Sequence, residues 1–430
     1  MNLLDKGRAE KINNLISLFR EGDMSLVIPE AAKLANELKS AIAYNILALA
    51  HKKLGNYAAA QKMYEKLLVD NPLNTLFLCN LGNIFGDTGE LDRAEECFKK
   101  CLKTDPKDYN ASVNLGDIYV KKARFDEALK IFKMMLEKKY VLTADQLHDI
   151  NYRVAEIYRS KGTFYYEQAI KHYGQSDNPL SSAHGLELIY RSKDKAAFLQ
   201  AEKKITQAGD LNPLLAAVQT HASIRYDSAN KNAFCQTPFE FIRYSKLTLK
   251  EGFNEELVEN LLKIKNELDS VPQALIDKGV QSAGNFLLSS DPNVQIIKNI
   301  IINRIKEYRA YYSDSNEGFI KSWPENANLH GWIIDLKKGG SLGSHMHKLG
   351  WLSGSLYLKL EKPLGSHQGN LIFDLNGADY PAGLNSYPSK ELNIEEGDIV
   401  LFPSSVFHKT VPFESEENRV TLAFDIKPIY

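Results

Sequence analysis

Small and aromatic residues recur at fixed positions every 34 residues in the first part of the chain. Aligning the chain on Gly55, Gly89 and Ala123 brings an alanine five residues later in each unit and an aromatic residue four further on. These positions are Ala60 and Tyr64, Ala94 and Phe98, and Ala128 and Phe132. Pro72 and Pro106 follow where a second helix has to stop. Small residues let two helices touch and the aromatic ring fills the space above them, so the pattern predicts stacked helix pairs.

This 34-residue pattern resembles that of tetratricopeptide repeats. Looser units flank it, one around Gly22 and one from Val154 to Gly162, whose second helix carries Ala169 and Tyr173 two residues late and so implies a small insertion. The resemblance covers roughly residues 10 to 175, and we assign residues 1–177 to a repeat solenoid. It implies a concave groove that holds a peptide or protein partner. Two alternatives stay open: the stack only supports a second domain, or it mediates self-association into a homo-oligomer.

Residues 178–232 keep a helical pattern of hydrophobic positions but lose the repeat. We interpret them as a helical region that closes the stack, because a terminal repeat needs a different outer face. A polar stretch at residues 228–232 then precedes a second domain, residues 233–430. Hydrophobic residues spaced by about 3.6 predict two amphipathic helices in it, over residues 255–268 and 294–311.

After Pro324 the hydrophobic residues alternate or form short runs, as they do in β-strands. We expect strands over residues 330–336, 351–360, 369–375, 399–403 and 418–426, with turns at 337–340 and 395–398. Short strands with glycine-rich turns after a helical segment favour a β-sandwich or jelly roll braced by helices. The predicted fold class is therefore multidomain, α + (α+β): helical repeats followed by a jelly roll with supporting helices.

Three histidines in this β-rich part are candidate metal ligands. His345 and His347 are one residue apart and would share one face of a strand, since side chains alternate with a period of two. His408 follows the strand expected at 399–403, and Arg419 comes eleven residues later. A third histidine on a neighbouring strand would complete a three-point grip on a metal ion.

The run from His345 to Tyr357, and the run from Gly397 to Ser404 followed by His408 and Arg419, resemble motifs of iron(II)- and 2-oxoglutarate-dependent oxygenases. The resemblance is to a bacterial and phage group of such oxygenases, more distantly to aspartyl/asparaginyl β-hydroxylases, and covers about residues 235–430. It implies a double-stranded β-helix with Fe(II) held by His345, His347 and His408. It also implies 2-oxoglutarate held by Arg419, Thr421 and Tyr357, because a guanidinium binds a carboxylate through two parallel hydrogen bonds.

One position departs from that family's pattern. The family usually has a carboxylate two residues after the first histidine, where this chain has His347. The site then consists of three neutral imidazoles, or of two histidines and water if His347 turns away. An imidazole in place of a carboxylate leaves the iron more positive and alters its redox properties. Asp374 is a weaker candidate for the missing carboxylate, and we interpret it as a turn or surface residue.

Other conspicuous residues have simpler interpretations. We expect His330 and His367 to be satisfied by hydrogen bonds, and Trp332 and Trp351 to belong to the core. Cys97 and Cys101 are one helical turn apart, but both occupy buried repeat positions and fit core cysteines better than metal ligands.

Charge and composition exclude several function classes. The 430 residues carry a net charge of −1 with a pI near 6.8, so no overall field favours nucleic acid or an anionic membrane. No apolar run approaches the roughly 20 residues of a transmembrane helix, and the N-terminal residues lack a signal-peptide pattern. Four cysteines favour free thiols in a reducing compartment, so we expect a cytoplasmic protein.

The leading hypothesis is an Fe(II)/2-oxoglutarate-dependent dioxygenase, a hydroxylase whose repeats position a peptide, a protein or another substrate. The missing carboxylate also fits a non-catalytic repeat adaptor with a degenerate oxygenase domain. Three histidines also fit a cupin-like dioxygenase that uses no 2-oxoglutarate. Both alternatives stay open on the sequence, which does not specify the substrate.

Overall fold

The structure is a computed structural model that describes residues 3–22, 24–139, 141–271, 273–361, 367–377, 379–381 and 383–429. Its internal contacts divide the chain into two units. The first comprises Met1–Met134, Glu259–Pro272 and Gln281–Lys298, and the second comprises Met135–Val258, Gln273–Val280 and Asn299–Tyr430. Neither unit is continuous in sequence. The domain boundaries expected at residues 177 and 232 assumed that each domain is one continuous segment, and they stay predictions.

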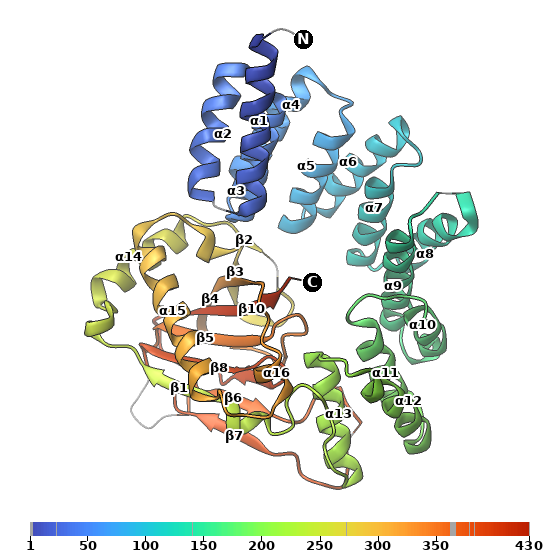
Figure 1. Cartoon of the computed structure of the whole chain (residues 1–430), viewed down its shortest axis with the longest axis vertical. Coiled ribbons are helices and arrows are strands. Elements are labelled where there is room, and N and C mark those ends of the chain that lie inside the picture. The colour runs from blue at the N-terminus through green and yellow to red at the C-terminus, as the bar shows by residue number, and fades with distance from the viewer. Residues whose placement is uncertain are drawn as a thin grey trace. The chain divides into compact units, whose positions relative to one another are not determined.

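Antiparallel helix pairs form the repeats of the first unit (Figure 1). They are α1 (Leu3–Glu21), α2 (Met24–Leu38), α3 (Ala41–Lys53), α4 (Tyr57–Asp70), α5 (Thr75–Thr88), α6 (Leu91–Thr104), α7 (Tyr109–Lys121) and α8 (Phe125–Met134). Gly55, Gly89 and Ala123 follow α3, α5 and α7 with positive φ angles of 86°, 85° and 55°. The three aligned positions therefore share one left-handed backbone conformation, although Ala123 carries a side chain.

The small and aromatic residues meet as the repeat pattern predicts. A Cβ atom added to Gly82 on α5 would lie 2.8 Å from the ring of Phe98 on α6, and one added to Gly116 on α7 would lie 2.3 Å from the ring of Phe132 on α8. Both rings are buried. Glycine is thus required where an aromatic ring packs directly on a helix backbone, and the predicted repeat stack is confirmed.

Two later segments complete the first unit. The carboxylate of Asp269 accepts a hydrogen bond from the Ala58 amide at 2.9 Å, and the Asn285 amide donates to the carbonyl of Lys53 at 2.9 Å. Between these bonds the backbones of Gly55 and Gly284 approach so closely that neither position has room for a side chain. The two amphipathic helices predicted after residue 250 are present as α14 (Glu255–Asn266) and α15 (Pro292–Tyr311), and β2 (Ser270–Val271) pairs with residues 281–282.

The second unit begins with five helices: α9 (Ala144–Ser160), α10 (Tyr166–Tyr173), α11 (Ser181–Ser192), α12 (Lys195–Ala208) and α13 (Pro213–Tyr226). The insertion expected between α9 and α10 is a short 3₁₀ turn at Thr163–Tyr165. The short α16 (Gly318–Lys321) comes later, before the strands. Each helix from α11 to α13 contributes to one buried apolar cluster, which also contains Met346 from the strand-rich part. These helices therefore pack directly against the strand-rich part.

The strands of the second unit form two sheets. Their bounds are β1 (Arg243–Lys246), β3 (Ile276–Ser282), β4 (Ala327–Leu342), β5 (Leu352–Lys359), β6 (Leu371–Asp374), β7 (Ser389–Leu392), β8 (Asp398–Pro403), β9 (Phe407–Thr410) and β10 (Arg419–Pro428). The main sheet runs in the order β1-β8-β5-β10-β4-β3, and the second sheet in the order β7-β6-β9 (Figure 1). After β5 the chain enters the second sheet for β6 and β7, returns to the main sheet for β8, crosses to the second for β9 and returns for β10.

A buried core joins the two sheets. It includes Tyr357, Val400 and Phe402 from the main sheet, and Leu371, Phe373 and Leu392 from the second. Two antiparallel sheets that exchange successive strands over a common core are the arrangement of a jelly roll. The predicted fold class is confirmed.

One local prediction is wrong. A turn was expected at residues 337–340, but β4 continues through them to Leu342. Gly339 has a φ of +72° and its amide donates to the carbonyl of Phe413 at 2.7 Å. A Cβ atom on Gly340 would lie 2.6 Å from the carbonyl oxygen of Lys337. The two glycines bend the strand without ending it. Glycine inside a strand often marks such a bend.

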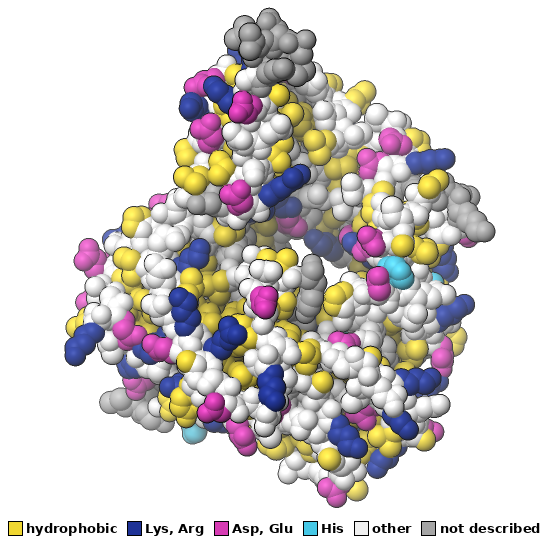
Figure 2. Space-filling view, in the orientation of Figure 1, with side chains coloured by type: hydrophobic (Ala, Val, Ile, Leu, Met, Phe, Trp, Pro, Cys, Tyr) yellow, Lys and Arg dark blue, Asp and Glu magenta, His cyan; other side chains and the backbone are white. Residues whose placement is uncertain are grey.

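Lysine and arginine side chains alternate with aspartate and glutamate over the face shown in Figure 2. This mixture agrees with the net charge of −1. Within the described residues, no helix combines the length and apolar character that crossing a membrane requires.

Candidate metal centre

The structure brings His345, His347 and His408 together. His408 lies on β9, and His345 pairs with it in an isolated antiparallel bridge whose two backbone hydrogen bonds measure 2.8 and 3.0 Å. The ring centres of His345 and His408 are 4.2 Å apart, and that of His347 is 5.2 and 5.1 Å from the other two. One ring nitrogen of each residue lies within 4.8 Å of the others. Each of the three rings would supply one nitrogen to a metal ion bound among them.

The hydrogen bonds of the three rings determine which nitrogen is free. His345 Nδ1 lies 2.8 Å from the carbonyl oxygen of Gly343, and His408 Nδ1 lies 3.1 Å from that of Val406. His347 Nδ1 lies 2.5 Å from Oδ1 of Asp425. Carbonyl and carboxylate oxygens only accept, so Nδ1 carries the proton in each ring and Nε2 keeps its lone pair. All three histidines thus present a metal-binding nitrogen.

Burial keeps the rings of His345 and His408 neutral. His408 is 5% exposed, and burial lowers its pKa well below the usual value. Burial also lowers the pKa of His345 to about 4. The rings of Phe402 and Trp332 enclose the group, with centres 4.7 Å from His408 and 5.6 Å from His347. A metal ion would not have to displace protons from His345 or His408 at neutral pH.

Apolar contacts with α11, α12 and α13 hold both histidine-bearing segments in place. Met346, between the first two histidines, belongs to the buried cluster formed by these helices. Phe407, next to His408, packs against the same cluster. Sequence reasoning assigned residues 178–232 only to closing the repeat stack and did not foresee this second contact.

Two residues that sequence reasoning missed support His347. Asp425 on β10 is 3% exposed and accepts hydrogen bonds from His347 at 2.5 Å and from the Ser353 hydroxyl at 2.8 Å. Burial alone would raise the pKa of Asp425, but His347 and Ser353 outweigh it and lower the pKa overall. The sequence offers little indication of this contact, because 78 residues separate Asp425 from His347.

The three residues predicted to hold a keto acid lie on neighbouring strands. Arg419 and Thr421 share one face of β10 with Asp425, and Tyr357 on β5 pairs directly with Thr421. Arg419 is 3% exposed and Tyr357 is fully buried. The guanidinium carbon of Arg419 lies 5.0 Å from the centre of the Tyr357 ring. Burial raises the pKa of Tyr357 to about 12, so its hydroxyl is a neutral donor at physiological pH.

Polar atoms of this trio are buried without a partner. Arg419 Nε, the Tyr357 hydroxyl and Thr421 Oγ1 are inaccessible to solvent and form no hydrogen bond with the described residues. Unpaired buried polar atoms cost about 1–3 kcal/mol each, more for charged groups. Donors of this kind on one sheet face fit a small dianion such as 2-oxoglutarate, whose far carboxylate would accept from the guanidinium and the hydroxyls.

The remaining candidates of the sequence analysis lie elsewhere or differ in role. The Asp374 carboxylate accepts a hydrogen bond from the Asn376 amide in a turn. It does not belong to the candidate metal-binding group, which consists of the three histidines. His367 is exposed and donates to Glu391. Trp351 is a core residue, as predicted, and its indole donates to the carbonyl of Phe319. The Trp332 ring instead lies tilted beside the His347 ring, so its assignment to the core covers only part of its contacts.

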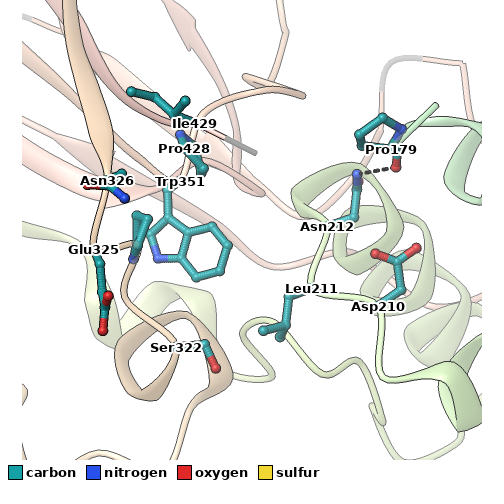
Figure 3. A pocket seen from close by; sticks show the side chains of 11 residues that line it. Pro179, Asp210, Leu211, Asn212, Ser322, Glu325, Asn326, Trp351, Pro428 and Ile429 are labelled. Atoms are coloured by element: carbon teal, nitrogen blue, oxygen red, sulfur yellow. Dashed lines mark hydrogen bonds between the residues drawn. The ribbon is translucent and has the colours of Figure 1, made fainter. Parts of the chain in front are cut away.

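A separate cavity of about 430 Å³ lies in the second unit (Figure 3). The Trp351 indole extends into it, with Asp210, Leu211 and Asn212 on the opposite side. Asn212 donates to the carbonyl of Pro179 at 3.0 Å, which fixes that side. Its lining contains acidic, neutral and apolar residues but none of the three histidines. This cavity is therefore distinct from the candidate metal centre.

Family models match both parts of the chain. A model described as "Putative 2OG-Fe(II) oxygenase" matches residues 330–425, which include the three histidines, Asp425 and Arg419. Three models described as "Tetratricopeptide repeat" match residues 41–68, 76–108 and 111–140. No curated protein matches the chain.

The similar solved structures include proteins described as tetratricopeptide repeat proteins. MamA (MSR-1) is 20% identical over 39% of this chain and 93% of its own, with a TM-score of 0.31. The pilF protein of Pseudomonas aeruginosa is 17% identical over 47% and 92%, with a TM-score of 0.39. A tetratricopeptide repeat protein from Parabacteroides merdae is 15% identical over 60% and 98%, also with a TM-score of 0.39.

Proposed function

We propose that this chain, which combines tetratricopeptide repeats with a 2OG-Fe(II) oxygenase domain, is an Fe(II)- and 2-oxoglutarate-dependent dioxygenase. In this proposal His345, His347 and His408 hold the metal through Nε2. Arg419, Thr421 and Tyr357 hold the far carboxylate of 2-oxoglutarate. Bound Fe(II) and 2-oxoglutarate together supply the oxidising power to hydroxylate a C–H bond with O₂.

The buried Arg419, whose Nε forms no hydrogen bond with the described residues, is the observation that carries the proposal. A buried guanidinium without a carboxylate partner among the described residues lowers the stability of the protein in the absence of a ligand. Neither alternative uses it: a cupin-like dioxygenase without a keto acid has no carboxylate to bind, and a degenerate adaptor has no need of a buried charge. A keto acid with a second carboxylate gives Arg419 its missing partner.

Succinate formation from 2-oxoglutarate tests this function. The purified full chain, supplied with Fe(II), 2-oxoglutarate, O₂ and ascorbate, should release succinate slowly even without the substrate that it hydroxylates. His408→Ala and Arg419→Gln should abolish this release. His367→Gln, which changes an exposed histidine away from the cluster, should retain it. Equal release by wild type and His408→Ala, or none by wild type loaded with iron, would contradict the proposal.

Tetratricopeptide repeats mediate protein interactions in general, and we place a peptide or protein partner in the groove of the first unit. A cavity of about 200 Å³ there is lined by Lys52, Gly82, Asn83, Gly86, Asp87, Phe98, Asn114, Asp117, Ile118 and Lys121. Asn83 and Asn114 present half-exposed side-chain amides at this cavity. An amide offers both a donor and an acceptor, which matches the backbone of an extended peptide.

Peptide selection tests the groove. Peptides selected from a random library on the full chain should bind Asn114→Ala at least about 5-fold more weakly, since one lost hydrogen bond costs about 1 kcal/mol. Asn110→Ala changes an exposed asparagine on the same helix outside the cavity and should leave affinity unchanged. Equal affinity of the peptides for both variants would contradict the role proposed for the groove.

The four cysteines are buried free thiols, which fits the cytoplasmic location we propose.

A further inference from the structure

We infer that Asp425 is a positioning residue of the metal centre, which supplies through His347 the negative charge that the three neutral histidines lack. The inference rests on the proposed function, because it concerns how these histidines bind a metal ion. It extends that function by explaining how a site with a histidine in the carboxylate's usual place still receives anionic charge.

The three histidines differ in what their Nδ1 protons meet. His345 and His408 each donate to a backbone carbonyl two residues away on their own segment. His347 instead donates to the Asp425 carboxylate on β10, at 2.5 Å. Hydrogen bonds to an ionised acceptor are shorter and about twice as strong as those to a neutral one. The charged partner belongs to the one histidine that replaces a carboxylate.

A closed ring of hydrogen bonds holds Asp425 in this position. The register of β10 on β5 places Asp425 opposite Ser353, whose hydroxyl donates to the same Oδ1 atom at 2.8 Å. The Ser404 hydroxyl lies 2.7 Å from that of Ser353 and, since Ser353 donates to Asp425, Ser404 is the donor between them. The carbonyl of Ser404 accepts from the His347 amide at 3.2 Å, which closes the ring.

Close packing shields one side of this ring. A Cβ atom on Gly350 would lie 2.6 Å from Ser404 Oγ and 3.3 Å from the carboxylate carbon of Asp425. Glycine is therefore required beside the ring, and the carboxylate is shielded on this side. In such surroundings electrostatic interactions are stronger than in water. The Asp425 carboxylate thus meets the His347 ring through a direct hydrogen bond in shielded surroundings.

A carboxylate hydrogen-bonded to a ligating imidazole has two effects on the metal. It fixes the ring so that Nε2 faces the ion, and it makes the ring a stronger electron donor. Changes of such partners typically lower metal affinity about 10- to 100-fold. We therefore expect Asp425 to raise the metal affinity of the site and to alter the electronic environment of the bound ion.

Co(II) titration of the full chain tests the inference. Asp425→Asn keeps the shape and one acceptor but removes the charge, so Co(II) should bind about 10- to 100-fold more weakly and with an altered visible spectrum. Asp335→Asn is the matched control, because Asp335 is buried on the adjacent strand and pairs with Val420, on the other face of β10. It should leave the Co(II) affinity and spectrum unchanged. Wild-type affinity and spectrum in Asp425→Asn would overturn the inference.

Wild-type protein provides a second test that does not depend on the folding of a variant. In nitrogen-labelled protein loaded with Zn(II), the Nδ1 proton of His347 should be the most deshielded of the three ring protons, because its acceptor is charged. The other two histidines serve as internal controls. Similar shifts for all three protons would overturn the role of Asp425. Absence of Co(II) binding by wild type, or undiminished binding by His408→Ala, would instead contradict the proposed function.

Discussion

Two fully buried tyrosines, one in each unit, differ in what their hydroxyl groups contact. In the repeats, the hydroxyl of Tyr64 donates to the side chain of Asn45 at 2.9 Å. In the jelly roll, the hydroxyl of Tyr357 has no partner among the described residues. An unpaired buried hydroxyl costs stability unless a bound ligand supplies its partner. Tyr357 lies beside Arg419 and Thr421, whose polar atoms are unpaired as well, which favours a ligand.

The two units thus use their buried residues differently. The repeat interior consists of interlocking small and aromatic residues whose positions follow from a helical period. The interior around the histidines contains neutral imidazoles, a buried aspartate and a buried arginine, which a protein optimised for stability alone would replace. The difference predicts that changes in the repeats alter stability, whereas changes around the histidines alter binding.

The largest expected effect is the loss of metal binding in His408→Ala. Its imidazole is one of only three clustered nitrogens, so Co(II) affinity should fall by more than about 100-fold, the upper end for residues that merely support a ligand. The repeats should be unaffected, and the helical circular dichroism signal should stay the same. Competition against a chelator measures the affinity. Wild-type affinity in this variant would remove the metal centre from the account.

A smaller effect, on stability alone, is expected at Gly116 in the repeats. Gly116→Ala places a Cβ atom 2.3 Å from the Phe132 ring and should lower the free energy of unfolding by about 1–3 kcal/mol through overpacking. Co(II) affinity should not change. The double variant Gly116→Ala with Phe132→Leu should recover part of the loss, because the smaller side chain frees the space. Urea denaturation of both variants measures these changes in the free energy of unfolding. A stability equal to wild type in Gly116→Ala would contradict the close packing of Phe132 on Gly116.

The pair of tyrosines allows a direct comparison of the two units. Tyr64→Phe should lower the free energy of unfolding by about 0.5–1.5 kcal/mol, since a satisfied hydrogen bond is lost. Tyr357→Phe should leave the stability of the ligand-free protein unchanged or raise it, while weakening 2-oxoglutarate binding. Thermal denaturation with and without 2-oxoglutarate measures both. Equal destabilisation by the two substitutions would show that Tyr357 has a structural partner.

The smallest expected effect is the response of the repeats to acid. Burial would raise the pKa of Glu95, but hydrogen bonds from Lys122 and Lys99 outweigh it and lower the pKa to about 2. The folded state therefore binds the proton less readily than the unfolded state. The stability that the ionised Glu95 contributes to the folded state is fully present above the ordinary glutamate pKa and is lost as the pH falls towards 2. Glu95→Gln should reduce this acid-dependent loss by about 0.2–1 kcal/mol per ion pair, and an unchanged pH profile of unfolding would contradict this assignment.

The sequence predicted the repeats and the three histidines for different reasons. The repeats depend on a local period, so Gly82, Phe98 and their counterparts could be read directly. The histidines depended on the alternation of side chains along strands and on resemblance to a family. Asp425 could not be found this way, because its contact with His347 depends on the register of β10 against β5. That register follows from packing across the whole sheet and leaves no short-range pattern.

Two further features escaped prediction for similar reasons. The continuation of β4 through Gly339 and Gly340 depends on contacts with Phe413 and other distant residues. The packing of Met346 and Phe407 against α11, α12 and α13 joins segments far apart in sequence. The glycines correctly indicated a bend, and the apolar residues correctly indicated burial. In neither case did the local sequence specify which distant residues are contacted.

An anaerobic titration of 2-oxoglutarate into the Fe(II)-loaded protein tests the central claim most directly. The account predicts saturable, metal-dependent binding by wild type and a loss of affinity of at least about 10-fold in Arg419→Met, since hydrogen bonds to charged groups contribute about 1.5–3 kcal/mol each. The same substitution should not destabilise the ligand-free protein, because it removes a buried charge whose Nε forms no hydrogen bond with the described residues. Arg124→Met, in the repeats, is the matched control and should bind 2-oxoglutarate normally. Undiminished binding by Arg419→Met, or no binding by wild type, would contradict the account.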